Sequence, residues 1–448
     1  MKQASRPNSH PLWRDGIAPL SLPAVTSEFS CDVAIIGAGF SGLWSAYHLL
    51  ILEPSLQIAI FESHEVGFGA SGRNGGWVSA DYPVDRKTLL RRYPTKDVDG
   101  FAALLRKGVD EIGAIASNIS PNSGFRKSGS LLFAMNDVQC DRLKDSVDAH
   151  HHLLTGDEVR SKVNLLSARG GLFAPDCATV NPRRLLIDLA QHLTMRGVAI
   201  YENSPALHHS RNLIVNGYPI DAKWVIRATE AFSKKSREQI PLYSLMIATR
   251  ALTDAERAAI GWSPGLAIAE ATHNVNYAQL APDLRMAVGG RGARYPYASR
   301  LDVGMEANTE THHALQTMIH NWFDQLGALE ITHHWGGAIA IRRNWESRIK
   351  VDQECGLAEL GGYVGDGMTM SFIAARSIAE RIITGNDPLR DMPISSGEQR
   401  MRRWPVEPFR YLGANALILN IRLLDRAESR GKRGRLLKAL MRLIGRTR

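Results

Sequence analysis

The sequence predicts an α/β protein in which a parallel-sheet unit is interrupted by a second unit built on an antiparallel-rich sheet. An apolar run at 33–36 leads through glycines into a helix-like pattern, and a second apolar run follows at 58–61. Strand-like runs dominate from 245 to 289, and a glycine-rich loop followed by a helical pattern returns near Gly365. We therefore expect the first unit to be discontinuous in the chain.

The first apolar run ends in Gly37-Ala38-Gly39-Phe40-Ser41-Gly42. The first glycine permits a tight strand-to-helix turn, the second lets the backbone approach a pyrophosphate, and the third lets the helix pack closely on the strand. The helix start offers free N–H groups to phosphates, and an acid ending the second apolar run can bind ribose hydroxyls. This predicts a Rossmann-like dinucleotide-binding unit, with an ordinary glycine-rich turn as the alternative. The expected contacts are Gly37, Gly39, Phe40, Ser41, Gly42 and Glu62.

The rest of the chain is divided by its patterns. Residues 1–30 carry four prolines and are expected to form an extended arm. A polar helical stretch is expected at 87–119, and a helix at 181–196 with Asn181 as N-cap and Pro182 at its first position. We assign the dinucleotide-binding domain to residues 31–86, 150–240 and 336–395, the substrate-binding domain to 87–149 and 241–335, and a basic helical extension to 396–448.

Composition excludes several classes of protein. With 44% hydrophobic and 22% charged residues, the 448-residue chain has the composition of a folded soluble protein. The four cysteines lack CxxC spacing, so we expect neither a disulfide framework nor a metal site. The N-terminus lacks the apolar segment of a secretory signal, and no apolar run is long enough to cross a bilayer. We therefore expect a cytoplasmic protein.

The net charge of +9 is concentrated at the C-terminal end. Residues 422–448 contain ten Arg or Lys and two acids, a local balance of +8. One interpretation is a basic amphipathic helix that makes a peripheral contact with an anionic membrane or with nucleic acid. The other, which we favour, is a helix that packs its leucines while its arginines stay solvated. The basic stripe consists of Arg435, Lys438, Arg442 and Arg446.

These motifs, in this order, resemble the D-amino-acid-oxidase-like (DAO) superfamily of FAD-dependent oxidoreductases. The γ-glutamylputrescine-oxidoreductase-like and glycine/sarcosine-oxidase-like branch is most similar, over about 12–428. Besides the first glycine motif, the resemblance rests on the glycine-rich loop 69–76, the Asn181-Pro182 helix, Ala228-Thr229-Glu230-Ala231, Gly289-Gly290-Arg291-Gly292, Trp335-Gly336-Gly337 and Gly365-Asp366-Gly367.

The resemblance implies bound FAD. Loop 69–76 would let the backbone approach the flavin ring, although a surface loop is the alternative, and the helix after Gly367 would direct its N-terminus at the flavin. Residues 338–350 contain no cysteine for covalent attachment, so FAD is expected to be non-covalent. The chain departs from the family at Trp345–Lys350 and has Gly-Asp-Gly where Gly-His-Gly is commoner. The expected flavin contacts are Ser71, Gly72, Arg73, Asn74, Gly75, Gly76, Gly365, Asp366, Gly367, Met368 and Thr369.

The implied reaction is oxidation of a C–N bond in a small amine or amino acid, with hydride transfer to flavin N5 and hydrolysis of the resulting imine. Arg291 is the candidate for holding a carboxylate or stabilising an anionic flavin, and Tyr277 for closing the pocket. A surface arginine and a core tyrosine are the alternatives. The electron acceptor is O2 or a quinone or other carrier. The absence of lysine from 286–288 favours a dehydrogenase, because oxidase relatives carry one there.

Two other functions are weighed against this one. A tRNA-modifying flavoprotein would share the flavin domain, but the basic residues are confined to the tail and lack interleaved aromatics, so no nucleic acid is expected. A flavin-binding protein with lost catalysis is suggested by the altered loop Trp345–Lys350.

Overall fold

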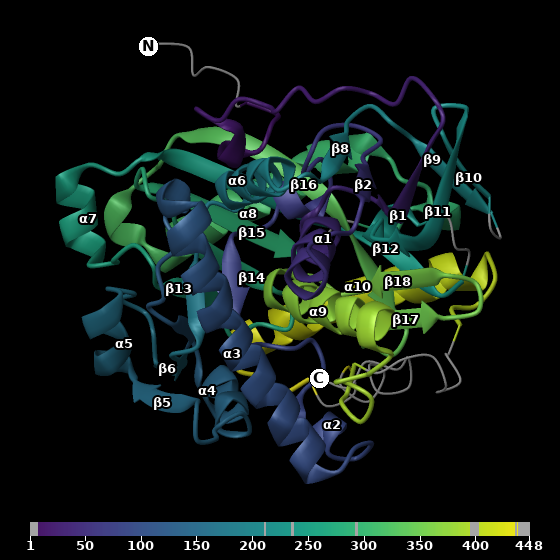
Figure 1. Ribbon diagram of the computed structural model, residues 1–448. Helices are drawn as coiled ribbons and strands as arrows, with labels where there is room; N and C mark the ends of the chain where they lie inside the picture. Colours follow the sequence, from purple (N-terminus) through teal and green to yellow (C-terminus); the bar gives the residue numbers. More distant parts are fainter. Residues whose placement is uncertain are drawn as a thin grey trace.

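The computed structural model describes residues 8–209, 212–233, 237–291, 294–394, 403–434 and 437. Two large sheets, each of eight strands, organise this part of the chain, and helices pack against them (Figure 1). The predicted α/β class with a parallel sheet and an antiparallel-rich sheet is confirmed.

The first sheet is mainly parallel. Its central order is β18-β11-β1-β2-β8, with every neighbouring pair parallel, and β17 adds an antiparallel edge. The last four residues of β1, Val33 to Ile36, are all buried because both faces of the sheet are covered. The strands are β1 (Phe29–Ile36), β2 (Ile58–Phe61), β8 (Ala199–Tyr201), β9 (Ala206–His209), β10 (Asn212–Val215), β11 (Tyr218–Arg227), β17 (Arg348–Asp352) and β18 (Leu357–Gly361).

Four helices form the apolar core on one side of this sheet. They are α1 (Phe40–Leu52), α3 (Thr95–Ile119), α6 (Pro182–Met195) and α9 (Gly367–Thr384), with α1 and α9 side by side (Figure 1). Asn181 caps α6 by accepting from the N–H of Arg184, and Pro182 opens the helix, as predicted. The stretch expected as one helix at 87–119 is divided, since α2 (Arg86–Leu89) ends before Pro94 and α3 starts after it.

The second sheet runs in the order β16-β12-β15-β14-β13-β4-β6-β5, and its described pairs are antiparallel except β4 with β13. Its strands are β4 (Ser130–Ala134), β5 (His152–Thr155), β6 (Gly170–Ala174), β12 (Gln239–Ala251), β13 (Ala267–Glu270), β14 (Asn276–Leu280), β15 (Arg285–Arg291) and β16 (Ile331–Arg342). The helices α4 (Asp137–Lys144), α5 (Gly156–Lys162), α7 (Asp254–Ile260) and α8 (Thr309–Trp322) accompany it, and β3 (Trp77–Ser79) pairs with β7 (Cys177–Thr179) separately.

Strand membership departs from the division drawn from the sequence. The strands β5 and β6 belong to the second sheet, although residues 150–240 were assigned to the dinucleotide-binding unit. The strand β16 continues in the second sheet past residue 336, where that unit was expected to resume. Pairing partners of short strands are decided by packing between distant segments, which local patterns do not encode. The domain boundaries themselves stay a prediction.

The N-terminal arm is packed onto the protein rather than free. The N–H of Asn8 donates to the carbonyl of Thr332 at 2.8 Å, and Leu12 and Trp13 are buried in a short 3-10 turn, Leu12–Arg14. Residues 1–7 lie outside the described part. The arm therefore reaches β16, some 320 residues further along the chain.

The C-terminal part contains the helix α10 (Phe409–Ser429), drawn in yellow in Figure 1. Of the residues predicted to form a basic stripe, all four lie outside the described residues. None of the helices in the described part of the chain is long and apolar enough to cross a membrane.

Candidate active site

The first glycine turn is held by close backbone contacts. Gly37 has a φ of +106°, and a Cβ there would lie 2.7 Å from the carbonyl oxygen of Ala228 at the end of β11. A Cβ on Gly42 would lie 2.0 Å from the carbonyl oxygen of Gly37. Both positions exclude a side chain, so the strand-to-helix turn requires glycine as predicted.

The start of α1 is joined to the two other glycine-rich loops. Its N-cap, Gly39, brings no side-chain cap, and the N–H of Phe40 donates to Ser71 Oγ at 2.9 Å. Ser41 Oγ lies 2.9 Å from the hydroxyl of Tyr363 in the third loop, 361–367, which connects β18 to α9. Burial raises the pKa of Tyr363 well above its usual range, so this hydroxyl stays neutral. Three loops predicted from separate parts of the sequence therefore converge.

Glu62 closes this arrangement from β2. Its carboxylate is buried, accepts from the N–H of Ala38 at 3.0 Å and accepts from the N–H of His64 at 3.1 Å. A second acid, which the sequence analysis missed, has a similar role, since Glu202 accepts from the N–H groups of Val66 and Leu22. Contact between Glu62 and a ribose stays a prediction.

The second loop, 67–76, is ordered by its own polar side chains. Arg73 donates from Nε to the carbonyl of Phe68 at 2.8 Å and from Nη1 to the carbonyl of Gly336 at 2.9 Å, and it forms an ion pair with Glu306 at 2.5 Å. Asn74 Oδ1 accepts from the N–H of Gly76 at 2.7 Å. The donors expected to reach a cofactor are thus directed largely to the protein.

Two tryptophans fix the backbone of the same loop. Trp13 Nε1 donates to the carbonyl of Asn74 at 2.8 Å, and Trp335 Nε1 donates to the carbonyl of Arg73 at 2.9 Å. Their rings meet edge to face, with centroids 6.4 Å apart. Trp335 belongs to a motif on which the family resemblance rests, whereas Trp13 lies in the proline-rich arm, where no motif indicated it.

The third loop is braced by a buried carboxyl. Glu230 accepts from the N–H of Gly362 at 2.7 Å, and burial raises its pKa to about 7 although backbone N–H groups lower it. A Cβ on Gly361 would lie 2.5 Å from the carboxylate of Glu230. Gly365 has a φ of +100°, and Asp366 at the N-cap of α9 makes no side-chain cap. A helix start without a side-chain cap can offer its first N–H groups to a ligand.

A cavity of about 1290 Å³ joins the second and third loops to the second sheet. Among the predicted residues it is lined by Arg73, Asn74, Gly75, Tyr277, Gly365, Asp366, Met368 and Thr369. The first glycine motif is not among its described lining residues, which fits an elongated ligand with one end at α1 and the other in the cavity.

The cavity wall contains two buried polar atoms without a hydrogen-bond partner among the described residues. They are Trp77 Nε1 and Thr369 Oγ1. An unpaired buried polar atom costs about 1–3 kcal/mol, so the cavity wall holds two polar groups for which a bound group could supply the missing partner. FAD fits this donor set, because its flavin ring carries carbonyl and nitrogen acceptors.

Of the two predicted catalytic residues, Tyr277 has a described side chain in the cavity wall and Arg291 has only a described backbone. Tyr277 lines the cavity, and its ring lies against two glycines, since a Cβ on Gly75 or Gly289 would come within 2.4 Å of it. Arg291 is the last residue of β15, paired with Ser244 of the cavity wall, and its side chain lies outside the described residues. Their roles in catalysis stay predictions.

A further cation was missed by the sequence analysis. Arg106 of α3 is half-buried, lines the cavity and has no ion-pair partner among the described residues. The helical spacing of Val98, Ala102 and Arg106, all lining residues, is the signal that could have indicated it.

Comparison with known proteins agrees with this geometry. The profile of the DAO family, described as FAD dependent oxidoreductase, matches residues 32–381. Gamma-glutamylputrescine oxidoreductase of Escherichia coli (strain K12) is 26% identical over 379 residues, covering 80% of this chain and 84% of that protein. A probable oxidoreductase, OrdL, of Haemophilus influenzae is 24% identical over 82% of this chain and 86% of its own length.

Solved structures show the same fold. Glycine oxidase from Geobacillus kaustophilus has a TM-score of 0.68 at 17% identity, over 83% of this chain and all of that chain. L-proline dehydrogenase from P. horikoshii has a TM-score of 0.66 at 15% identity, over 83% of this chain and 98% of that chain. With the converging glycine loops and the matched 32–381 region, the chain belongs to the DAO family of FAD-dependent oxidoreductases.

Proposed function

We propose that the protein oxidises the C–N bond of a small amine or amino acid, giving an imine that water hydrolyses to a carbonyl compound and an amine or ammonia. The observation that carries this is the cavity between the second loop, the start of α9 and the second sheet, whose wall includes the unpaired polar groups of Trp77 in β3 and Thr369 in α9. Relatives whose names specify amine or amino-acid substrates support the same class.

FAD would be held by α1, the second loop and the start of α9, and would supply the hydride acceptor at flavin N5. We propose that it is bound non-covalently. None of the four cysteines is among the described residues that line the cavity, and Cys177 is fully buried, which raises its pKa well above the usual range. A thiol in that state is a poor nucleophile for attachment.

The chain's own residues would bind and orient the substrate. Tyr277, fixed between Gly75 and Gly289, forms a rigid wall, and positioning of this kind is the main requirement of a reaction whose reactive group belongs to the cofactor. Arg106 and Arg291 are the candidate partners of a substrate carboxylate. The amine has to be neutral to release hydride from its α-carbon, so we expect activity to rise with pH through the pKa of the bound amine.

The electron acceptor is proposed to be O2 or a diffusible carrier such as a quinone, with a preference for the carrier. The segment 286–288, Met-Ala-Val, is buried in β15 and offers no cation. An oxidase would convert O2 to hydrogen peroxide as each amine is oxidised, which a peroxidase-coupled assay detects.

The test is an anaerobic titration of the purified yellow protein with a panel of amines and amino acids. We expect at least one compound to bleach the flavin absorbance, and denaturation to release the flavin into the supernatant. A protein that takes up no FAD would contradict the cofactor assignment. A loaded protein bleached by no amine would contradict the proposed substrate class.

A further inference from the structure

The outer face of α10 carries an exposed apolar stripe. Phe409 is 67% exposed, Leu412 60% and Leu419 55%, which is unusual for large apolar side chains in one helix. The members recur every three or four residues and so lie on one face; they are Phe409, Leu412, Ala416, Leu419 and Leu423. Just before the helix, Val406 is also exposed, at 52%.

The opposite face of α10 already has its partners. Leu417 and Leu424 are buried, and Glu428 pairs with Arg142 and with His273 Nε2, at 2.5 and 2.9 Å. Asp425 accepts from the backbone N–H of His273 at 2.6 Å. These contacts fix the orientation of the helix. The apolar stripe therefore stays exposed when α10 packs against the other described residues.

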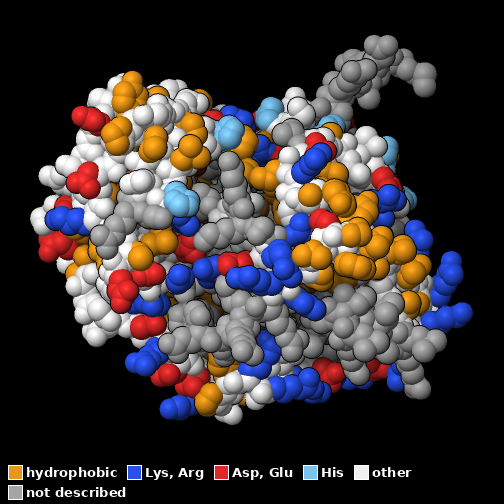
Figure 2. Space-filling model, turned by 90° about the vertical axis from the view of Figure 1, so that its right-hand side faces the viewer, with side chains coloured by type: hydrophobic (Ala, Val, Ile, Leu, Met, Phe, Trp, Pro, Cys, Tyr) orange, Lys and Arg blue, Asp and Glu red, His pale blue; other side chains and the backbone are white. Residues whose placement is uncertain are grey.

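The same contacts segregate the charges. Both acids of the last two turns, Asp425 and Glu428, are directed inward, whereas Arg426 and Arg430 are exposed. Lys432 and Arg433 follow immediately and are also exposed, with Arg433 in an ion pair with Asp141 at 2.9 Å. The outward surface at this end of α10 therefore combines apolar side chains with positive charge. In Figure 2, hydrophobic side chains gather at the upper left and at the right of the viewed face, and Lys and Arg side chains border the group at the right.

The positive charges near the apolar stripe indicate which partner can cover it. The chain beyond Leu437 has apolar residues, but it also carries Lys438, Arg442, Arg446 and Arg448 with no acid. Placing it on the stripe would bring like charges together, and a second copy of α10 would bring its own arginines. An anionic surface neutralises both the helix and the tail while it buries the stripe.

We propose that α10 lies in the headgroup region of an anionic membrane, with its apolar stripe buried and its arginines among the lipid phosphates. This places the membrane contact on α10 and not on the tail stripe, for which the sequence analysis favoured a packed helix with solvated arginines. The proposal is independent of the substrate, since it rests on the surface of α10 and on the charges of the residues that follow it.

The experiment is co-sedimentation of the full-length, FAD-loaded protein with vesicles of phosphatidylcholine, alone or mixed with phosphatidylglycerol. We expect binding to the anionic vesicles only, weakened by salt because the exposed charges are screened. The double variant Leu412→Ser/Leu419→Ser should bind about tenfold less or weaker still, since it removes buried apolar area. Arg426→Glu should also weaken binding, with its flavin content unchanged.

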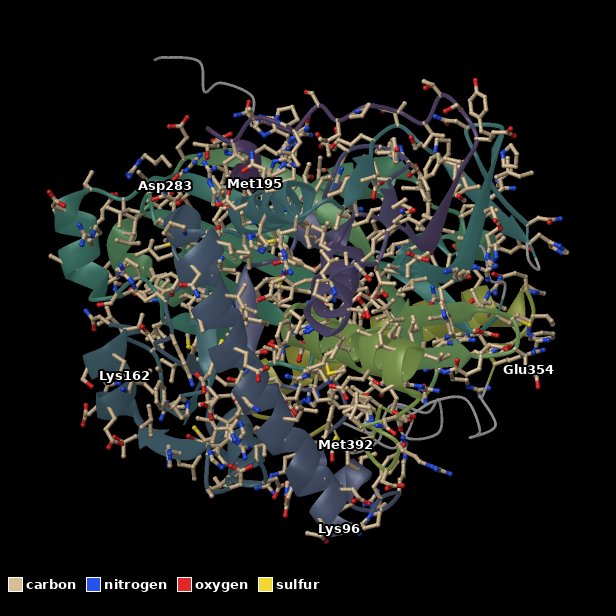
Figure 3. All side chains as sticks on the ribbon, viewed as in Figure 1. Lys96, Lys162, Met195, Asp283, Glu354 and Met392 are labelled. Atoms are coloured by element: carbon tan, nitrogen blue, oxygen red, sulfur yellow. The ribbon has the colours of Figure 1, made fainter. Side chains whose placement is uncertain are left out.

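Matched controls are available elsewhere on the surface. Leu207→Ser changes an exposed leucine of β9, 64% accessible, and Lys96→Glu reverses a charge at the start of α3, at the lower edge of Figure 3. Both controls should bind vesicles as the wild type does. Circular dichroism and flavin content show whether each variant is folded.

Several results would overturn the proposal. One is no binding of the wild type to anionic vesicles, and another is binding of the folded α10 variants as strong as that of the wild type. A third is a dimer in sedimentation velocity that the leucine variant abolishes, without vesicle binding, because this would assign the stripe to a second copy. Retention of RNA in place of vesicles would equally contradict it.

Discussion

Replacing Gly42 by alanine is expected to damage cofactor binding through one steric contact. The new Cβ would lie 2.0 Å from the carbonyl oxygen of Gly37, whereas such contacts are essentially never shorter than 3.0 Å. The turn and α1 would have to separate by about an ångström, which costs about 1–3 kcal/mol for an overpacked site. The same movement displaces the helix start from the cofactor, and each 1.4 kcal/mol lost there weakens the Kd by about tenfold.

The assay is FAD affinity, by fluorescence titration of the apoprotein, together with the melting temperature. Gly413→Ala is the matched control, because this glycine of α10 has no atom within 4 Å of its Cβ position. A helical alanine should leave FAD binding unchanged and stabilise the protein by about 0.5–1 kcal/mol. If Gly42→Ala binds FAD as tightly as the wild type does, the steric account of this turn is wrong.

Three further predictions concern the loops and the cavity. Ser71→Ala removes the acceptor of the Phe40 N–H and should cost about 1 kcal/mol, measured by denaturant unfolding; an unchanged midpoint would contradict it. Burial raises the pKa of Glu230 from 4.5 to about 7. The folded state therefore keeps the Glu230 proton up to a higher pH than the unfolded state does, and the free energy of unfolding should fall as the pH rises across that interval. Glu230→Gln should weaken the dependence of the melting temperature on pH in this interval. An equally strong dependence in the variant would exclude Glu230 as its cause. Arg106→Ala should raise the KM of a carboxylate-bearing amine about tenfold or more and leave that of its uncharged analogue unchanged, with partial rescue by Arg106→Lys; equal effects on both substrates would refute a carboxylate role.

The sequence predicted the local parts of the site better than their assembly. Gly37 and Gly42 could be assigned because a strand-to-helix turn at a phosphate site demands glycine at that spacing. The membership of β5, β6 and β16 could not, because it depends on which distant strand each one meets. The roles of Trp13 and Arg106 also depend on tertiary contacts, since no local pattern shows that an arm residue supports the second loop or that a helix face borders a cavity.

The contacts that join the loops have a consequence for biosynthesis. Ser41 meets Tyr363 across 322 positions of the chain, and Arg73 meets Trp335 across 262. A ribosome delivers the N-terminal segment first, and domains fold as their partners become available. The first two loops are therefore made long before the residues that hold them in place. FAD is expected to enter the protein as a late event, after synthesis has passed α9.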